Sequence, residues 1–551
     1  MVCKIISSLE KCFLDESIES KPQYSAASML KNEVFHFGVC YQIKSQKVHG
    51  KGFYKMSVSS PIAGYIKFCR VNHVPVHMPA YKEHIDDNYL RTAPGIYPDL
   101  LVPIEPGQRM MGSDDLQSLF ATVDTGAQVS AGVYPVEVTF STMEDEYVCS
   151  AKLELEIIDA MLPPQSLIYT NWFHCDCLQS YYGTESFDEK HWQIIENFLS
   201  TAAKHGMNTV LTPIFTPPLD TDIGRERPTT QLIDITVTDS GYSFGFDNLD
   251  RWIDTCQRVG IEYYEIAHFF TQWGALHAPK IVANVNGQTK KIFGWETDSC
   301  SPEYREFLQA LIPALLEHLR MRGVDRQCMF HVSDEPKLDQ LEQYGRARAI
   351  VAPLLKGYPI IDALSNYEFY EQGVVEHPVP SSNHIEPFIE GKVPGLWTYY
   401  CCGQGRNVSN RFIAMPSART RVLGTQMFKY DIAGFLQWGY NFYYNQRSHE
   451  LINPYVCTDG DYFGPAGDAF SVYPALDGSA HASLRLNAFF DGLQDMRAMQ
   501  QCAKLYSKEY VIRLIEENIP PVTFASYPHD ADWLLTVREK INTAIKAAAG
   551  K

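Results

Sequence analysis

Two adjacent carboxylates, Asp334 and Glu335, end the apolar stretch CMFHVSDEP and are the residues of this chain best suited to acid–base chemistry. An apolar strand that ends in acidic residues presents them where a parallel barrel carries its catalytic groups. Like charges held side by side raise each other's proton affinity, so one carboxyl can stay protonated as an acid while the other is ionised. The same dipeptide also fits an ordinary helix start, with Asp334 as N-cap and Glu335 and Pro336 in the first turn.

The adjacency of the two acids restricts the mechanism. Glycosidases usually take their acid and nucleophile from different strands, with the carboxyl groups about 5–5.5 Å apart for retention and about 6.5–9.5 Å apart for inversion. Neighbouring residues fit that spacing poorly. They fit a substrate-assisted reaction, in which the 2-acetamido oxygen of the sugar attacks the anomeric carbon while one carboxylate orients the amide and the other protonates the leaving oxygen.

Aromatic and polar side chains gather in other segments that follow predicted strands. Aromatic faces stack on the C–H face of a pyranose ring, and hydroxyl and amide groups hydrogen-bond its rim. Each aromatic taken alone is explained by core packing, and a lone histidine such as His268 by structural hydrogen bonds. Their concentration at strand ends favours a sugar site. The residues that we assign to substrate binding are Trp273, His277, Trp295, Trp397, Tyr400, Trp438, Tyr440 and Asn441.

One cluster, at residues 174–177, combines the residue types that bind metals, as His-Cys-Asp-Cys. Alternate residues of a strand point to opposite faces, and no second Cys/His pair stands at ligand spacing. We therefore predict no metal site, and no organic cofactor, because two carboxylates and a substrate amide can supply acid, base and nucleophile.

The elements that must position these residues divide the chain into three parts. Short alternating runs in residues 1–160 predict an antiparallel β-sandwich, which ends at the proline-containing segment MLPPQS. Strands alternating with amphipathic helices over residues 165–480 predict a (β/α)8 TIM-like barrel. Residues 481–551 have a helical pattern, which we expect to pack on the barrel. The predicted fold is therefore multidomain α/β.

Composition narrows the partners of this 551-residue chain. A formal net charge of −18 disfavours nucleic acid, and no apolar run is long enough to span a bilayer. The N-terminal sequence lacks the apolar core and cleavage site of a secretory signal. We therefore expect a cytoplasmic protein with 14 reduced cysteines that acts on a small carbohydrate or glycoside, without a membrane partner.

Four segments resemble one known family. HVSDEP, WGYNFYY, SNRFIAMPSARTRVLGTQ and GDAFSVYPALDGSAHASLRL are similar to glycoside hydrolase family 123 and its uncharacterised relatives, over about residues 172–493. The resemblance implies a β-sandwich followed by a (β/α) barrel, and the retaining, substrate-assisted release of β-linked N-acetylgalactosamine. It also implies that Asp334 orients the acetamido group and that Glu335 acts first as acid and then as base.

Two other interpretations stay open. The first is a glycosidase for a sugar without an acetamido group, in which Glu335 is the acid and a distant carboxylate, such as Glu265 or Glu296, is the nucleophile. The second is a non-catalytic carbohydrate-binding protein with the same barrel and aromatic cleft. A pure binder need not carry the electrostatic cost of burying two neighbouring acids.

Overall fold

The structure, a computed structural model, describes residues 1–44, 52–105 and 107–550 and divides into two compact units. The first unit contains residues 1–166, 405–430 and 481–551, and the second contains residues 167–404 and 431–480. The chain thus leaves the first unit and returns to it twice. Among the described residues, no helix combines the length and the apolar character needed to cross a membrane.

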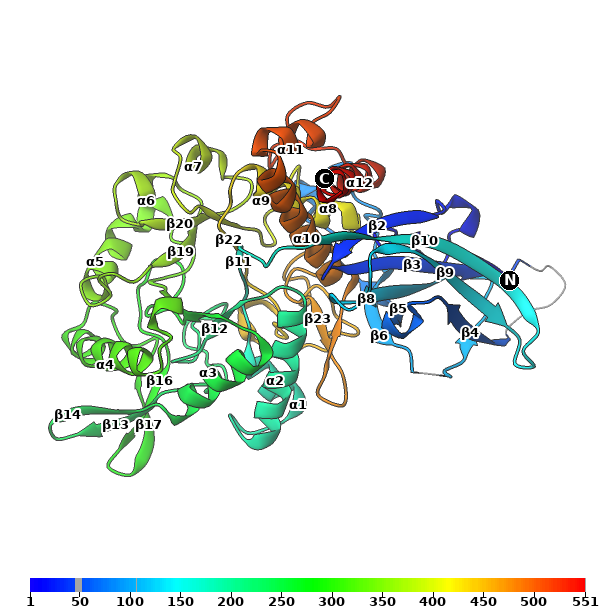
Figure 1. The fold of residues 1–551 in the computed structure, drawn as a ribbon. Coiled ribbons are helices and arrows are strands. Elements are labelled where there is room, and N and C mark those ends of the chain that lie inside the picture. The colour runs from blue at the N-terminus through cyan, green and yellow to red at the C-terminus, as the bar shows by residue number, and fades with distance from the viewer. Residues whose placement is uncertain (45–51, 106, 551) are drawn as a thin grey trace. The chain divides into compact units, whose positions relative to one another are not determined.

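Two mostly antiparallel sheets form the N-terminal part of the first unit (Figure 1). The first sheet has the order β1 (Val2–Ser7), β3 (Val34–Gln42), β8 (Gln117–Asp124), β5 (Ile66–Val76) and β6 (Gly95–Pro103). The second has the order β2 (Ala26–Lys31), β10 (Tyr147–Met161), β9 (Gly132–Ser141), β4 (Phe53–Ser59) and β7 (Met110–Met111), with β2 and β10 parallel.

One hydrophobic core draws on both sheets, with Phe37 and Leu119 from the first and Val138 and Leu155 from the second. Strand β10 shows the period of two behind this arrangement, because its buried and exposed residues alternate from residue 151 to 155. The antiparallel sheets predicted for this part of the chain are therefore confirmed.

Five α-helices among the described residues complete the first unit, and three of them belong to residues 481–551, a segment that is predicted from its pattern to pack on the barrel. Helices α10 and α12 instead belong with the antiparallel sheets, because α12 packs along β2 and β10 and Arg485 of α10 donates two 2.9 Å hydrogen bonds to the buried Asp99 of β6. The helices are α8 (Ser417–Arg421), α9 (Leu423–Lys429), α10 (Leu484–Leu505), α11 (Lys508–Ile515) and α12 (Ala531–Ala549).

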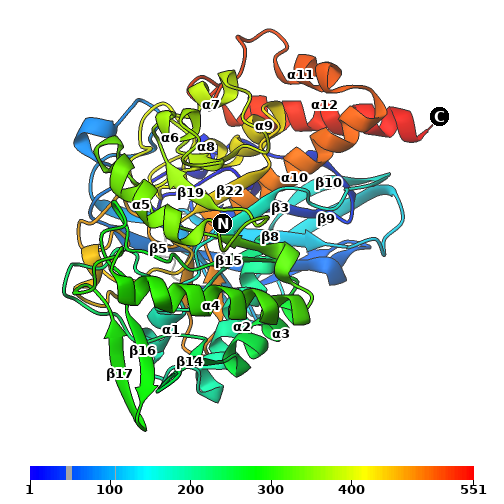
Figure 2. The same cartoon turned by 90° about the vertical axis from the view of Figure 1, so that its left-hand side faces the viewer.

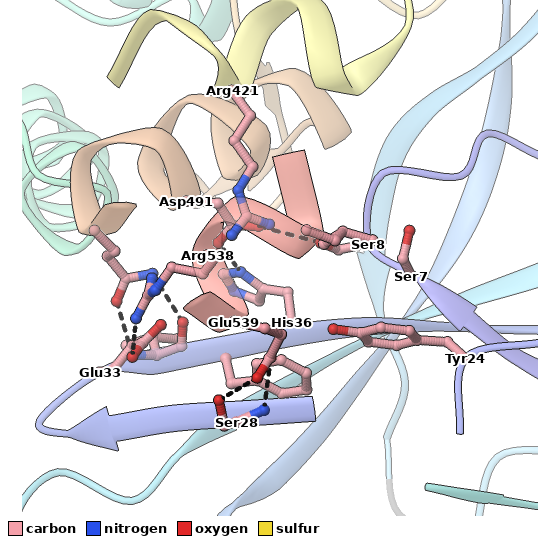
Figure 3. A pocket seen from close by; sticks show the side chains of 14 residues that line it. Ser7, Ser8, Tyr24, Ser28, Glu33, His36, Arg421, Asp491, Arg538 and Glu539 are labelled. Carbon is pink, nitrogen blue, oxygen red and sulfur yellow. Dashed lines mark hydrogen bonds and ion pairs between the residues drawn. The ribbon is translucent and has the colours of Figure 1, made fainter. Parts of the chain in front are cut away.

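A buried group of charged residues, the helix–sheet ion cluster, links these helices to strands of the first unit (Figure 3). Arg538 donates to Glu33 at 2.7 Å and to Asp495 at 3.0 Å. Arg421 donates two hydrogen bonds to Asp495, at 2.7 and 2.9 Å. The members of the cluster are Glu33, His36, Arg421, Asp491, Asp495 and Arg538.

A curled parallel sheet forms the centre of the second unit. Its strands have the order β18 (Cys328–Phe330), β15 (Tyr263–Ile266), β12 (Thr209–Thr212), β11 (Ile168–Asn171), β22 (Gly434–Gln437) and β21 (Trp397–Tyr399). A separate parallel pair, β19 (Ile361–Leu364) and β20 (His377–Pro380), is bridged to β18 through Phe330 and Ile360 and to β21 through Ser381 and Tyr399. Short, almost fully buried strands are typical of parallel sheets covered by helices, and the predicted parallel sheet is confirmed.

Helices follow most of these strands, on the outside of the sheet (Figure 2). Their ends follow from local sequence: Asp188 caps α2, Ser301 caps α4 just before a proline, and Gly260 ends α3 in the left-handed conformation. The helices are α1 (Cys175–Tyr182), α2 (Glu189–Lys204), α3 (Asp247–Val259), α4 (Pro302–Met321), α5 (Leu341–Val351), α6 (Glu368–Glu371) and α7 (Glu386–Glu390).

Two hairpins form a four-stranded sheet that protrudes at the bottom of both views (Figures 1 and 2). The second hairpin turns at Asn286 and Gly287, which both have positive φ, as this kind of turn requires. The strands are β13 (Asp234–Thr238), β14 (Gly241–Gly245), β16 (Ile281–Val285) and β17 (Gln288–Phe293). The remaining strands are β23 (Val472–Pro474) and β24 (Ala480–Ala482).

Candidate active site

The carboxylates lie on the loop that follows β18, and this loop is held from both sides. Its backbone carbonyls at 331 and 332 accept hydrogen bonds from residues 269 and 270, beyond β15. On the other side, the Glu335 amide donates to the Ala363 carbonyl of β19 at 3.1 Å. The next α-helix begins only at Leu341, so Asp334 does not start a helix, and the helix-start interpretation does not describe this loop.

Asp334 and Glu335 line a cavity of about 250 Å³ at the carboxyl ends of the parallel strands. This is where an α/β sheet collects its loops and where enzymes of this architecture place their sites. The other walls come from loops after β11, β12, β15 and β22 and from β21 and the turn that follows it. They include Trp172, Asp220, Gln272, Trp273, Tyr399, Cys401, Cys402, Trp438, Arg447 and Phe463.

The two carboxylates have different surroundings. Burial, together with the neighbouring charge of Glu335, raises the pKa of Asp334 well above its ordinary value. Glu335 accepts a 2.6 Å hydrogen bond from the Tyr399 hydroxyl. Burial and the Glu335 charge raise the pKa of Tyr399, so its hydroxyl keeps the proton that it donates. The pair can therefore hold one proton at a pH where two isolated carboxyls would both be ionised.

Backbone strain is concentrated beside the pair. Glu335 has a φ of 43° and Trp273 a φ of 60°, in the left-handed region that side chains other than glycine rarely adopt. Such residues cost about 1–3 kcal/mol each and persist only where neighbouring contacts impose them. Here the Trp273 amide donates to the Asp334 carbonyl at 3.0 Å, and the Gln340 amide group donates to the Trp273 carbonyl at 2.8 Å. The strained loop holds Trp273 against the catalytic loop.

Beneath the pair lies a buried triad of Glu265, His331 and Asp362, all completely inaccessible to solvent. His331 contacts Glu265 at 2.6 Å and Asp362 at 3.2 Å through its two ring nitrogens. Burial opposes a charge on His331, but the hydrogen bonds and charges of the two carboxylates outweigh it and raise its pKa to about 10. The imidazolium charge favours ionisation of Asp334, against the stronger effect of burial.

The triad also connects to the cavity and to the catalytic loop. Glu265 accepts a 2.8 Å hydrogen bond from the indole of Trp172, which lines the cavity. Asp362 accepts from the Val332 amide at 3.1 Å and from the Tyr344 hydroxyl. The triad therefore fixes one wall of the cavity and the start of the catalytic loop together.

One group of residues in the described part of the chain has metal-ligand atoms close together: His268, His331 and Asp362, within 4.8 Å of one another. The rings of His268 and His331 stack at 4.2 Å with planes 17° apart. Imidazole binds metals through lone pairs in the ring plane, so two nearly parallel rings cannot both direct a lone pair at one ion. The nitrogens of His331 are also engaged by carboxylates, so this group does not fit a metal ion.

The cluster at 174–177 has a structural role. Helix α1 starts at Cys175, and Arg227 donates two 2.7 Å hydrogen bonds to Asp176, with both side chains buried. His174 contacts the backbone carbonyl of Trp438 at 2.9 Å, and so helps to hold that cavity residue.

Of the eight residues assigned to substrate binding, Trp273 and Trp438 line the cavity with the carboxylates. His277 and Trp295 lie elsewhere, with their rings 5.8 Å apart, and Trp295 lines a different cleft beside Pro217 and Lys280.

The other four assigned residues are buried in packing positions. Trp397 lies so close to Gly434 that a side chain at 434 would collide with its ring, and the Tyr400 ring contacts Phe435 at 4.9 Å. The Tyr440 hydroxyl donates to a carbonyl of α2, and the Asn441 side chain pairs with the backbone of residue 174.

The structure adds cavity residues that the sequence assignment omitted: Trp172, Asp220, Tyr399 and Arg447. The alternation of strand residues separates Tyr399 from Tyr400, and this signal could have indicated that only one of the two lines the cavity. Burial raises the pKa of Asp220 to about 6, although its carboxylate accepts a 2.9 Å hydrogen bond from the Arg447 amide. No local pattern in the sequence marks Asp220, which lies in an irregular loop, or Arg447, which lies in a three-residue 3-10 helix.

Comparison with known proteins gives one family. Residues 172–502, more than half of the chain, match the family described as glycoside hydrolase 123, catalytic domain. The whole chain is similar in structure to a family 123 glycoside hydrolase from Clostridium perfringens, studied for glycolipid glycan hydrolysis, with 15% identity, a TM-score of 0.76 and coverage of 100% of this chain and 98% of that chain. At that identity the similarity shows a shared fold.

Two other solved structures match more weakly. A β-glucuronidase from Parabacteroides merdae has 8% identity, covers 84% of this chain and 52% of its own, and has a TM-score of 0.30. A GH10 xylanase from Thermobacillus composti has 12% identity and a TM-score of 0.28, and the match covers 59% of this chain and 97% of the xylanase chain. Scores this low support no argument. No curated protein matches the chain.

Proposed function

Because this chain belongs to glycoside hydrolase family 123, we propose that it releases β-linked N-acetylhexosamines, N-acetylgalactosamine first among them, by a retaining and substrate-assisted reaction. The observation that carries the proposal is the pair Asp334 and Glu335, adjacent in one cavity and held in different surroundings. A cavity of about 250 Å³ is small for a ligand pocket and favours one terminal sugar over a long chain.

In the first step, the ionised Asp334 accepts a hydrogen bond from the N–H of the 2-acetamido group, which turns the carbonyl oxygen of that group toward the anomeric carbon. That oxygen attacks the carbon, the bond to the leaving oxygen breaks, and Glu335 transfers its proton to the leaving oxygen. In the free protein, burial and the charge of Glu335 favour a proton on Asp334. A bound amide N–H favours the ionised form of Asp334, so the proton of the pair moves to Glu335 as the sugar binds.

In the second step, water attacks the anomeric carbon of the cyclic intermediate and gives its proton to Glu335, while the bond to the amide oxygen breaks. Two inversions at the same carbon give overall retention. Tyr399 stabilises the ionised Glu335 between the two steps through its 2.6 Å hydrogen bond. Trp172, Trp273 and Trp438 supply apolar faces for the ring and its acetamido methyl group.

We also infer that the second unit is a closed barrel and that the two antiparallel sheets of the first unit form a sandwich. The bridges from β18 to β19 and from β20 to β21 support closure of the parallel strands into a (β/α)8 barrel, and the shared core of the two antiparallel sheets supports a β-sandwich. The similarity to the Clostridium perfringens structure over the whole chain agrees with both inferences.

A second candidate is a glycosidase for a sugar without an acetamido group, which would need a separate nucleophile. Glu265 is fully buried in the triad, and Glu296 is an exposed partner of Lys291 that does not line the cavity. The observation that favours this candidate is Asp220, a third carboxylate in the cavity.

The test is hydrolysis of matched aryl β-glycosides with and without a 2-acetamido group, by the wild type, Asp334→Asn and Asp220→Asn. The proposal expects turnover of acetamido sugars alone and a greater loss in Asp334→Asn. Turnover of plain sugars, abolished in Asp220→Asn, would replace the proposal by the second candidate. Absence of turnover across a panel that includes N-acetylgalactosaminides and N-acetylglucosaminides would overturn both.

A further inference from the structure

Two neighbouring thiols, Cys401 and Cys402, both line the catalytic cavity. They follow β21 and stand two and three residues after Tyr399, the hydrogen-bond donor to Glu335. Both are half-buried and reduced. The proposed hydrolysis uses neither of them, so the cavity contains a pair of neighbouring thiols that its sugar chemistry leaves unexplained.

The turn after β21 places the two side chains together. Neighbouring residues of an extended strand point to opposite faces, but here the strand has ended at Tyr399. The Cys401 amide donates to the Gln404 side chain at 2.8 Å, and the Gln404 amide donates back to the Cys401 carbonyl at 3.3 Å. Gln404 is itself held by a 2.9 Å hydrogen bond to Asn383. Within this turn the two thiols share a hydrogen bond.

The chemistry of this pair favours chelation over single-thiol reactions. The hydrogen bond that the Cys401 thiol donates to Cys402, burial and the nearby charge of Glu335 all raise the pKa of Cys401, so it is a poor isolated nucleophile. Two adjacent thiols can still condense with a soft trivalent centre. With an arsenoxide, two As–S bonds form, the arsenic–oxygen bond breaks, and the oxygen leaves as water with the two thiol protons. No oxidant is required.

We propose that Cys401 and Cys402 form a thiophilic binding site in the cavity wall, which takes a trivalent arsenical and thereby blocks access of a glycoside to Glu335. Binding depends only on the thiols and their turn. Inhibition rests in addition on the proposed glycosidase function, so the two consequences can be measured separately.

Two other cysteine pairs serve as controls. Cys12 and Cys40 share a hydrogen bond but are only 1% and 0% exposed. Cys3 and Cys149 also share one, and Cys149 is half-buried. Both pairs belong to the first unit, and none of the four cysteines lines the cavity. Cys149→Ser is therefore the matched control, since it removes a partly accessible dithiol outside the site.

The experiment treats the native full-length protein with one equivalent of phenylarsine oxide and measures the intact mass. We expect one phenylarsenic group on the wild type and on Cys149→Ser, and at least a tenfold lower occupancy on Cys401→Ser and Cys402→Ser. A dithiol should remove the group and a monothiol should not. The proposal would be overturned if both cavity variants kept the wild-type occupancy. It would also be overturned if Cys149→Ser, and not the cavity variants, lost the phenylarsenic group.

Inhibition is measured on the same samples, each relative to its own untreated activity. We expect turnover of the wild type to fall in proportion to occupancy, and a saturating sugar to slow labelling. Full occupancy without loss of turnover would overturn the blocking step. If no glycoside in the panel is turned over, the proposed function fails, while the mass measurement still decides whether the dithiol site exists.

Discussion

The helix–sheet ion cluster of the first unit and the catalytic carboxylates of the second unit bury acidic groups in opposite electrostatic settings. In the ion cluster, Glu33, Asp491 and Asp495 face two guanidinium groups and a histidine at hydrogen-bond distance. In the second unit, the His331 ring contacts the two carboxylates of the triad, and its charge also acts on Asp334, which adjoins Glu335.

The difference is clearest between Asp491 and Asp334, although burial also raises the pKa of Glu33 in the ion cluster. Burial opposes ionisation of Asp491, but the charges of His36 and Arg421 outweigh it and lower its pKa. At Asp334 burial and a like charge act in the same direction, and the pKa rises. Removal of one partner from a balanced buried ion pair is costly, whereas an excess of one sign of buried charge holds a proton that chemistry can use. We therefore expect changes in the ion cluster to alter stability, and changes in the carboxylate pair to alter turnover.

The largest effect on turnover is expected for Glu335→Gln, which removes the acid without changing the side-chain shape. Loss of general acid–base catalysis should lower kcat by about 10²–10⁴-fold for a poor leaving group. The loss should be smaller for an activated aryl group, whose departure needs little protonation. Steady-state kinetics with the two kinds of leaving group measure this, with Glu296→Gln as the matched control. Equal losses for both leaving groups would contradict an acid role.

The largest effect on stability is expected for Arg538→Met in the ion cluster, because it leaves Glu33 buried without its cation. Removal of one partner of a buried pair costs about 3–5 kcal/mol of unfolding free energy. Lys540→Met, which breaks an exposed pair with Glu517, should cost under about 1 kcal/mol. Urea unfolding measures both. The folded Arg538→Met protein should turn over substrate as fast as the wild type. A large fall in its kcat would contradict the view that the ion cluster affects stability alone.

A pH-dependent effect is expected for the triad. The pKa of His331 is raised to about 10 in the folded protein, so the folded state binds more protons than the unfolded state from about pH 6.5 to 10. Its contribution to stability is complete below that window and is lost as the pH rises through it. The difference in unfolding free energy between the wild type and His331→Gln should therefore shrink toward pH 10. A difference that is constant between pH 6 and 10 would refute a charged His331.

The smallest effect is expected at the cavity rim. Trp273→Ala should lower kcat/KM by about 2–10-fold, since an aromatic stacking contact contributes about 0.5–1.5 kcal/mol. Trp295→Ala should leave kcat/KM unchanged, because Trp295 lies outside the cavity. Kinetics with one aryl N-acetylhexosaminide compare the two. A greater loss at Trp295 than at Trp273 would place the sugar in the other cleft.

Much of the second unit could be predicted from local sequence. The alternation of strands and helices indicates the parallel sheet, and the carboxyl end of an apolar strand indicates where Asp334 and Glu335 lie. Aromatic type alone could not separate cavity from core: Tyr400 and Tyr440 have the same side chain as Tyr399 but pack away from the cavity.

The return of residues 405–430 to the first unit had no local signal. Helices α8 and α9 are short and buried almost throughout, so no exposed polar face in their sequence indicates which unit they join. Their place depends on long-range pairs such as Arg419 with Asp86, which are 333 residues apart in the chain. Such pairs arise only in the folded chain, and for the same reason no sequence pattern marked Asp220 as a cavity residue.

The most direct test of the carboxylate pair is one variant measured in two ways, Asp334→Asn at neutral pH. Asp334 has a raised folded pKa, so its ionisation destabilises the fold above its ordinary pKa, and the neutral amide removes that cost. We predict that turnover of an acetamido substrate falls by at least about 10²-fold while the melting temperature rises by roughly 2–4 °C. A variant that keeps its turnover, or that loses turnover together with stability, would contradict the assignment of Asp334 as a buried catalytic carboxylate with a raised pKa.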